Sequence, residues 1–167
     1  MRLQRYLNES CVLLRLTTWP NYPGVTDVED EELERVREGV INEFADVFDS
    51  SGSVSNRKKL ADDLLARERR TSTAIGGGIA FPHVRTRQAR GFALAVARSE
   101  PGLPFAAVDD KLVHLFVAMI APPHDDKLFL RVESTLARAF TESQDFYNAI
   151  MEAQEPGEIV RALASLR

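Results

Sequence analysis

The apolar run LVHLFVAMI, residues 112–120, is the feature that most limits what this chain can fold into. It is rich in Val, Leu, Ile and Phe and stops at Pro122-Pro123, so it predicts a buried β-strand. Residues 11–16 predict a second short buried strand, and residues 79–81 predict another, which ends at Pro82. Residues 91–97 predict a strand because the run is short, begins at a glycine and is soon followed by a Pro-Gly turn.

Helical patterns flank these strands on both sides of the sequence. The spacing of apolar residues predicts a helix over residues 27–48, whose acidic first turn suits a helix N-terminus. A second helix is expected from an N-cap at Ser55 or Asn56 to Arg70. Residues 125–140, 145–154 and 157–166 predict three more, with Asp125 or Asp126 as the cap of the first. The expected fold class is α/β: a single-domain sandwich over residues 1–167, with a mixed central sheet of about five strands flanked by helices.

Charge and cysteine content exclude several classes of function. The formal net charge is −4, so the chain lacks the general excess of Lys and Arg that nucleic-acid binding requires, although Arg67, Arg69 and Arg70 together can hold one anion. Cys11 is the single cysteine, which rules out an internal disulfide and fits a reducing cytoplasm. No apolar stretch approaches the roughly 20 residues that cross a bilayer. We therefore expect a cytoplasmic protein without a membrane span.

His83 is the strongest candidate for a chemical role. Three glycines and a proline precede it in the run GGGIAFPH, residues 76–83. The glycines allow backbone N–H groups to approach an anion, and Pro82 fixes the backbone before the histidine. Arg67 offers a guanidinium for phosphate, and Ser72 and Thr73 offer hydroxyls nearby in the sequence. A neutral imidazole is a good nucleophile near pH 7.

These residues also fit other interpretations. A histidine after a proline at a strand end is usually structural, and the glycines alone could form a tight turn. The run is neither a P-loop nor a dinucleotide fingerprint, because it lacks Gly-Lys-Ser/Thr and a third correctly spaced glycine. His83, His114 and His124 lack metal-ligand spacing, and no Gly-x-Ser-x-Gly elbow is present. We expect no metal and no cofactor.

The run from Arg67 to His83 reads RERRTSTAIGGGIAFPH and resembles a known family in three parts, RE, STAIG and GIAFPH. It is similar to the hallmark of the fructose/mannitol-type enzyme IIA domain of the bacterial phosphoenolpyruvate-dependent sugar phosphotransferase system, a group that includes the nitrogen-regulatory IIA proteins. The spacing of Arg67 and His83 is also similar. The resemblance covers residues 56–166, and residues 1–50 are atypical.

This resemblance implies that His83 accepts a phosphoryl group from the phosphohistidine of the small carrier HPr. Arg67 is implied to bind that group, and Thr73, with Ser72 as the lesser candidate, to orient the imidazole or touch the phosphate. The family often carries a second histidine on the following helix, where this chain has Phe129. His124 lies five residues earlier and is a candidate auxiliary residue. The replacement by Phe129 bears on onward transfer more than on phosphorylation.

Three functions remain open from the sequence. The chain is expected to be a phosphoryl carrier that passes the group to a separate IIB protein, or a regulatory protein whose phosphorylation changes what it binds. A third alternative is a IIA-like domain that only binds other proteins. No IIB or IIC domain is attached, which favours a freestanding, regulatory protein.

Overall fold

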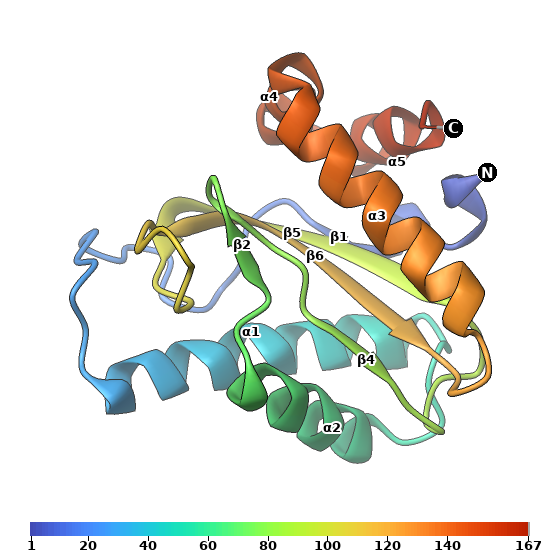
Figure 1. Ribbon diagram of the computed structural model, residues 1–167, viewed down its shortest axis with the longest axis horizontal. Helices are drawn as coiled ribbons and strands as arrows, with labels where there is room; N and C mark the ends of the chain where they lie inside the picture. The colour runs from blue at the N-terminus through green and yellow to red at the C-terminus, as the bar shows by residue number, and fades with distance from the viewer. Residues whose placement is uncertain (167) are drawn as a thin grey trace.

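A mixed sheet of six strands forms the middle layer of the protein, with the order β1-β5-β6-β3-β2 and β4 paired to β6. The computed structural model describes residues 1–166. Helices α1 and α2 cover one face of the sheet, and α3, α4 and α5 cover the other (Figure 1). The predicted α/β sandwich with a mixed sheet is therefore confirmed, with one strand more than expected.

The centre of the sheet is the antiparallel pair β5 (Ala93–Leu103) and β6 (Val113–Ala121). β6 coincides with the apolar run at residues 112–120, and all its residues except His114 are buried. β5 runs further than expected, because Pro101 and Gly102 lie inside the strand at an irregularity instead of ending it. Gly102 has φ +79°, and a Cβ there would lie 2.8 Å from the His114 ring.

Two short strands pair with β6 on the side opposite β5. β3 (Ile79–Ala80) and β4 (His83–Arg85) each pair with β6 in parallel, one after the other. β2 (Ala74–Gly76) pairs antiparallel with β3 through a turn at the consecutive glycines, where Gly77 and Gly78 have positive φ. Neither β2 nor β4 was expected as a strand.

The opposite side of the sheet ends at β1 (Val12–Leu13), which pairs in parallel with β5. The predicted strand 11–16 is too long, because Cys11 belongs to a 3-10 helix, Glu9–Cys11, capped by the Asn8 side chain. Another 3-10 helix, Leu3–Arg5, precedes it. The N-terminal segment therefore contributes mainly irregular backbone, with buried Leu3 and Leu7 packed into the core.

The five α-helices follow the predicted order with shifted ends. They are α1 (Asp30–Ser50), α2 (Arg57–Arg70), α3 (Asp126–Glu142), α4 (Gln144–Glu152) and α5 (Pro156–Ala164). Asn56 is the N-cap of α2, and its side chain accepts a hydrogen bond from Lys59 N at 3.0 Å. Asp125 is the N-cap residue of α3 but makes no side-chain capping bond. Within residues 1–166, none of these helices combines the length and apolar character that a bilayer crossing requires.

Candidate active site

His83 is the first residue of β4 and lies at the side of the sheet, where its side chain is 15% exposed. Pro82 O accepts a hydrogen bond from Met119 N at 2.9 Å, and Phe81 N donates to Thr73 O at 3.0 Å. The backbone on the N-terminal side of the histidine is thus bonded to β6 on one side and to the β2 region on the other. Buried Phe81 fixes this segment to the core.

The imidazole is held in one tautomer. His83 Nδ1 lies 2.7 Å from Phe81 O, and a carbonyl oxygen can only accept, so Nδ1 carries the proton and donates. The lone pair of the neutral ring is then on Nε2. A histidine arranged in this way presents Nε2 as its nucleophilic atom.

Helix α3 packs beside the His83 ring. The Phe129 ring centroid lies 5.1 Å from that of His83, and Glu133 Oε1 lies 3.9 Å from Nδ1. Phe129 is buried and carries no donor, so α3 presents an apolar surface and one carboxylate here. The carboxylate is on the Nδ1 side and stabilises positive charge on the ring.

The electrostatic balance keeps His83 neutral. Burial lowers its pKa from the ordinary value of 6.5, and the positive charges of Arg67 and Arg85 lower it further. The hydrogen bond to Phe81 and the charge of Glu133 act in the opposite direction but do not cancel the effect of burial. The imidazole therefore stays unprotonated, and nucleophilic, at neutral pH.

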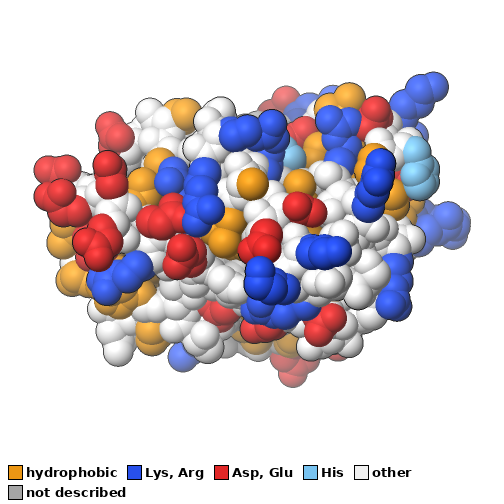
Figure 2. All heavy atoms as spheres, turned by 90° about the horizontal axis from the view of Figure 1, so that it is seen from below, with side chains coloured by type: hydrophobic (Ala, Val, Ile, Leu, Met, Phe, Trp, Pro, Cys, Tyr) orange, Lys and Arg blue, Asp and Glu red, His pale blue; other side chains and the backbone are white. Residues whose placement is uncertain are grey.

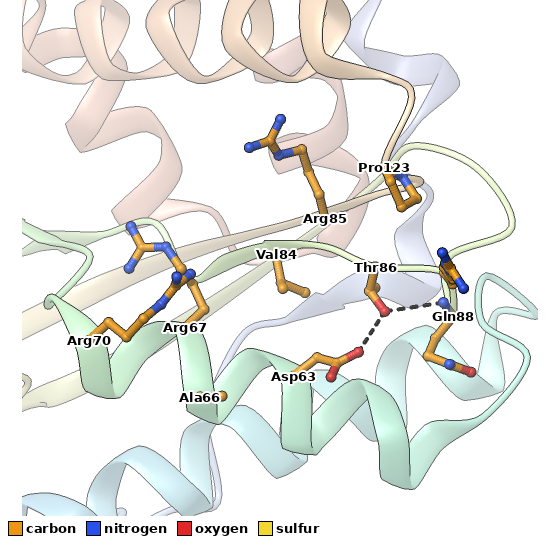
Figure 3. A pocket seen from close by; sticks show the side chains of 10 residues that line it. Asp63, Ala66, Arg67, Arg70, Val84, Arg85, Thr86, Gln88 and Pro123 are labelled. Atoms are coloured by element: carbon orange, nitrogen blue, oxygen red, sulfur yellow. Dashed lines mark hydrogen bonds between the residues drawn. The ribbon is translucent and has the colours of Figure 1, made fainter.

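Arg67 comes from the last turn of α2, where its Nη1 donates to Thr71 O at 2.9 Å. It lines an open pocket of about 670 Å³ between α2 and β4. Figure 3 shows Arg67 and Arg70 rising from the end of α2, with Arg85 on the other side of β4, directed towards α3. Arg87 lines the same pocket, and Ala66 and Val84 contribute apolar surface between the arginines. Four arginines thus line a pocket that also includes Val84, the residue after His83.

The charge distribution over the α1 and α2 face is uneven. Figure 2 shows acidic side chains gathered at the end of this face where α1 begins and Lys and Arg predominating towards the other end. The acidic group includes the first turn of α1, Asp30, Glu31 and Glu32, and the last turn of α2 lies near this half of α1, where Arg69 pairs with Glu34 and Glu38.

The two hydroxyls expected at the site are both bonded within the protein. Ser72 Oγ donates to Phe105 O at 2.7 Å, and Thr73 Oγ1 donates to Glu68 Oε2 at 2.7 Å. Thr73 N donates to the other oxygen of Glu68 at 2.9 Å. Glu68 is buried, which raises the pKa of its carboxyl, although the bonds from Thr73 oppose this shift. The structure thus connects Thr73 to His83 through the backbone of Phe81.

The other two histidines have partners of their own. The His124 side chain is 81% exposed, and its Nε2 lies 3.9 Å from Asp125. His114 Nδ1 donates to the carbonyl oxygens of Ser99 and Glu100, both at 3.1 Å. Among residues 1–166, no three His, Cys, Asp or Glu side chains come close enough together to hold a metal ion.

Two residues that the sequence did not single out contact the site. Arg85 is two positions after His83 in β4, so both side chains project from the same face of the strand. Glu133 lies four positions after Phe129 in α3 and therefore shares its face of the helix. Recognising residues 83–85 as a strand would have revealed Arg85, whereas the sequence carried no signal that brought Glu133 to the histidine.

Comparison with known proteins gives the same picture. Residues 28–166 match the family model described as phosphoenolpyruvate-dependent sugar phosphotransferase system, EIIA 2. The chain is 31% identical over 136 residues to the PTS system fructose-specific EIIA component of Haloferax volcanii, covering 81% of this chain and 88% of that protein. It is also 31% identical over 108 residues to a nitrogen regulatory protein of Klebsiella oxytoca, covering 57% and 67% of the two chains.

The fold is likewise shared with a solved structure. The nitrogen regulatory protein IIA-Ntr from Neisseria meningitidis superposes with a TM-score of 0.78 at 22% identity, covering 96% of this chain and 97% of that one. The family model spans most of the chain, including α2, the glycine turn and His83. The chain belongs to the EIIA 2 family of the phosphoenolpyruvate-dependent sugar phosphotransferase system.

Proposed function

We propose that this protein is a phosphoryl carrier, in which Nε2 of His83 accepts a phosphoryl group from the phosphohistidine of HPr. The observation that carries the proposal is the fixed tautomer: Nδ1 donates to Phe81 O, so a neutral imidazole offers its lone pair at Nε2. Membership of the EIIA 2 family supports HPr as the donor and the cytoplasm as the location.

The transfer requires no proton to move. The Nε2 lone pair forms a bond to phosphorus while the N–P bond of the donor breaks and its electron pair returns to the donor ring. The proton on Nδ1 stays in its hydrogen bond to Phe81 O, and Glu133, 3.9 Å away, offsets the positive charge of the ring. Catalysis then consists of alignment and of positive charge around the phosphoryl oxygens.

Arg67 supplies that positive charge from the end of α2. One of its nitrogens is fixed by Thr71 O, which leaves the other donors of the guanidinium for phosphoryl oxygens. A charge-assisted bond of this kind strengthens as negative charge collects on the equatorial oxygens. We assign Arg67 the role of binding the phosphoryl group during transfer.

Thr73 and Ser72 support the site through hydrogen bonds within the protein. Thr73 N donates to the Glu68 carboxylate, Phe81 N donates to Thr73 O, and His83 Nδ1 donates to Phe81 O. Thr73 orients the imidazole through this sequence of bonds. Ser72 fixes the start of β2, because its Oγ also accepts from Ala74 N at 3.1 Å.

The acceptor after His83 is a separate IIB protein or a regulatory target whose binding depends on phosphorylation. Replacing a neutral imidazole by a phosphorylated one adds roughly two negative charges to the surface beside the arginines. Either partner would detect that change.

Reconstitution with phosphoenolpyruvate, enzyme I and HPr tests the proposal by following labelled phosphate. Wild-type protein is expected to take up label that is acid-labile and base-stable, and His83→Ala to take up none. His124→Ala is the matched control, since that histidine is exposed and lies against Asp125, and it should label fully. Label that persists in His83→Ala, or that is missing from folded wild type, contradicts the proposal.

A further inference from the structure

We propose that Arg85 is a second phosphoryl-binding residue, which exchanges its partner Asp126 for the phosphoryl group when His83 is phosphorylated. This inference rests on the proposed function of His83 and adds a residue that binds the group from the α3 side. It also connects phosphorylation to the first residue of α3.

The backbone brings Arg85 to the correct side of the strand. β4 pairs with β6 in regular register, with His83 opposite Met119 and Arg85 opposite Ala121. Alternate residues of a strand project from the same face, about 6–7 Å apart, so Arg85 and His83 are neighbours on that face. Val84 projects from the other face and lines the pocket beneath.

Phe129 brings the two functional groups together. Its ring packs against the His83 ring at 5.1 Å, and the Arg85 guanidinium carbon lies 6.0 Å from the same ring centroid. The Arg85 guanidinium can move over the Phe129 ring towards the imidazole and keep a favourable cation–π contact with that ring. Phe129 has no donor of its own, whereas Arg85 brings a cation to this side of the ring.

The present partner of Arg85 is easily exchanged. Arg85 Nη1 is paired with Asp126 Oδ1, but the two side chains are 50% and 56% exposed. Exposed ion pairs are weak, whereas a phosphoryl group carries roughly two negative charges and three acceptor oxygens. Asp126 is in the first turn of α3, where the helix dipole favours a carboxylate after Arg85 has left.

The phosphoryl group would then lie between two arginines from opposite layers. Arg67 approaches from α2 on one face of the sheet, and Arg85 stands on the α3 side of β4 (Figure 3). The positive charges of both arginines lower the pKa of His83, in agreement with this placement. Two arginines can contact different oxygens of the group at once.

The test is the equilibrium of labelled phosphate between HPr and this protein, compared across three variants. Arg85→Ala is expected to shift the equilibrium about tenfold towards phospho-HPr, because one charge-assisted bond to the product is lost. Asp126→Asn should shift it in the opposite direction, towards phospho-His83, because Arg85 no longer has a competing partner. Arg138→Ala, which removes an exposed cation elsewhere on α3, is the charge-matched control and should leave it unchanged.

A second readout follows the exchange directly. In 15N NMR spectra of the wild-type protein, phosphorylation should shift the Arg85 guanidinium signal and the Asp126 amide, and Arg85→Ala should abolish the shift at Asp126. An equilibrium that is the same in wild type, Arg85→Ala and Asp126→Asn overturns this inference alone. Absence of label from wild type would instead contradict the proposed function of His83.

Discussion

The two sides of the sheet use arginine in opposite ways. At the β1 side, Arg98 of β5 directs Nε to Leu14 O at 3.1 Å and Nη1 to the carbonyl oxygens of Ile150, Met151 and Ala153 at 2.8–2.9 Å. Burial lowers the pKa of this guanidinium. At the β4 side, Arg67 donates to one carbonyl, and Arg85 pairs with an exposed carboxylate.

The difference lies in where the donors point. Arg98 joins the N-terminal segment to the end of α4, whose last carbonyls have no partner within the helix, so its donors serve the fold. Arg67 and Arg85 keep donors in an open pocket beside an imidazole, where a bound anion can accept them. The same side chain thus stabilises structure on one side of the sheet and is proposed to bind phosphate on the other.

The largest effect is expected from Arg67→Ala. Loss of a positively charged donor at the reacting group should slow phosphorylation by phospho-HPr about 100-fold, measured as the single-turnover rate of label transfer. Arg69→Ala is the matched control, because Arg69 pairs with Glu34 and Glu38 of α1 and not with the pocket. A wild-type rate in Arg67→Ala would remove the contrast between the two sides of the sheet.

Arg98→Met should lower the stability of the protein and leave phosphoryl transfer unchanged. Four carbonyl oxygens lose their donor, so the free energy of unfolding is expected to fall by about 2 kcal/mol in urea titrations. The rate of phosphorylation of the folded protein should stay at the wild-type value. Arg15→Met, which removes an exposed cation from the same region, serves as the control. A slower phosphoryl transfer in folded Arg98→Met would mean that the two sides are coupled.

The sequence predicted the parts of this arrangement that local pattern determines. The run at residues 112–120 is β6, and the motif around Arg67 and His83 identified the pocket at the end of α2. The segment between Pro82 and Gly91 is short and mostly polar, and its apolar residues show no clear periodicity. They become a strand because β6 offers a partner, and Arg85 was overlooked for that reason.

Other differences have the same origin in tertiary contacts. Pro101-Gly102 is a turn signal by composition, yet β6 and His114 hold it within an irregular strand. Arg98 was not distinguished from other arginines, because its four acceptors come from segments more than fifty residues away in both directions. Long-range partners decide which arginine is structural, and sequence pattern does not reveal them.

The smallest predicted effect concerns Glu133, the one carboxylate close to the His83 ring. Protonated His83 has no lone pair at Nε2, so the phosphorylation rate should fall as the pH decreases through the His83 pKa, which lies below 6.5. Glu133 raises that pKa, so Glu133→Gln should lower it and move the acid limb of the pH–rate profile to lower pH.

NMR titration of the His83 ring protons measures the same shift without the donor protein. Glu142→Gln, at the far end of α3, removes an equal charge and should leave the titration unchanged. Arg85→Ala should move the pKa in the opposite direction, because it removes a positive charge from the same ring. If Glu133→Gln raised the pKa, the carboxylate would not act on the imidazole as its 3.9 Å separation indicates, and the β4 side would depend on its arginines alone.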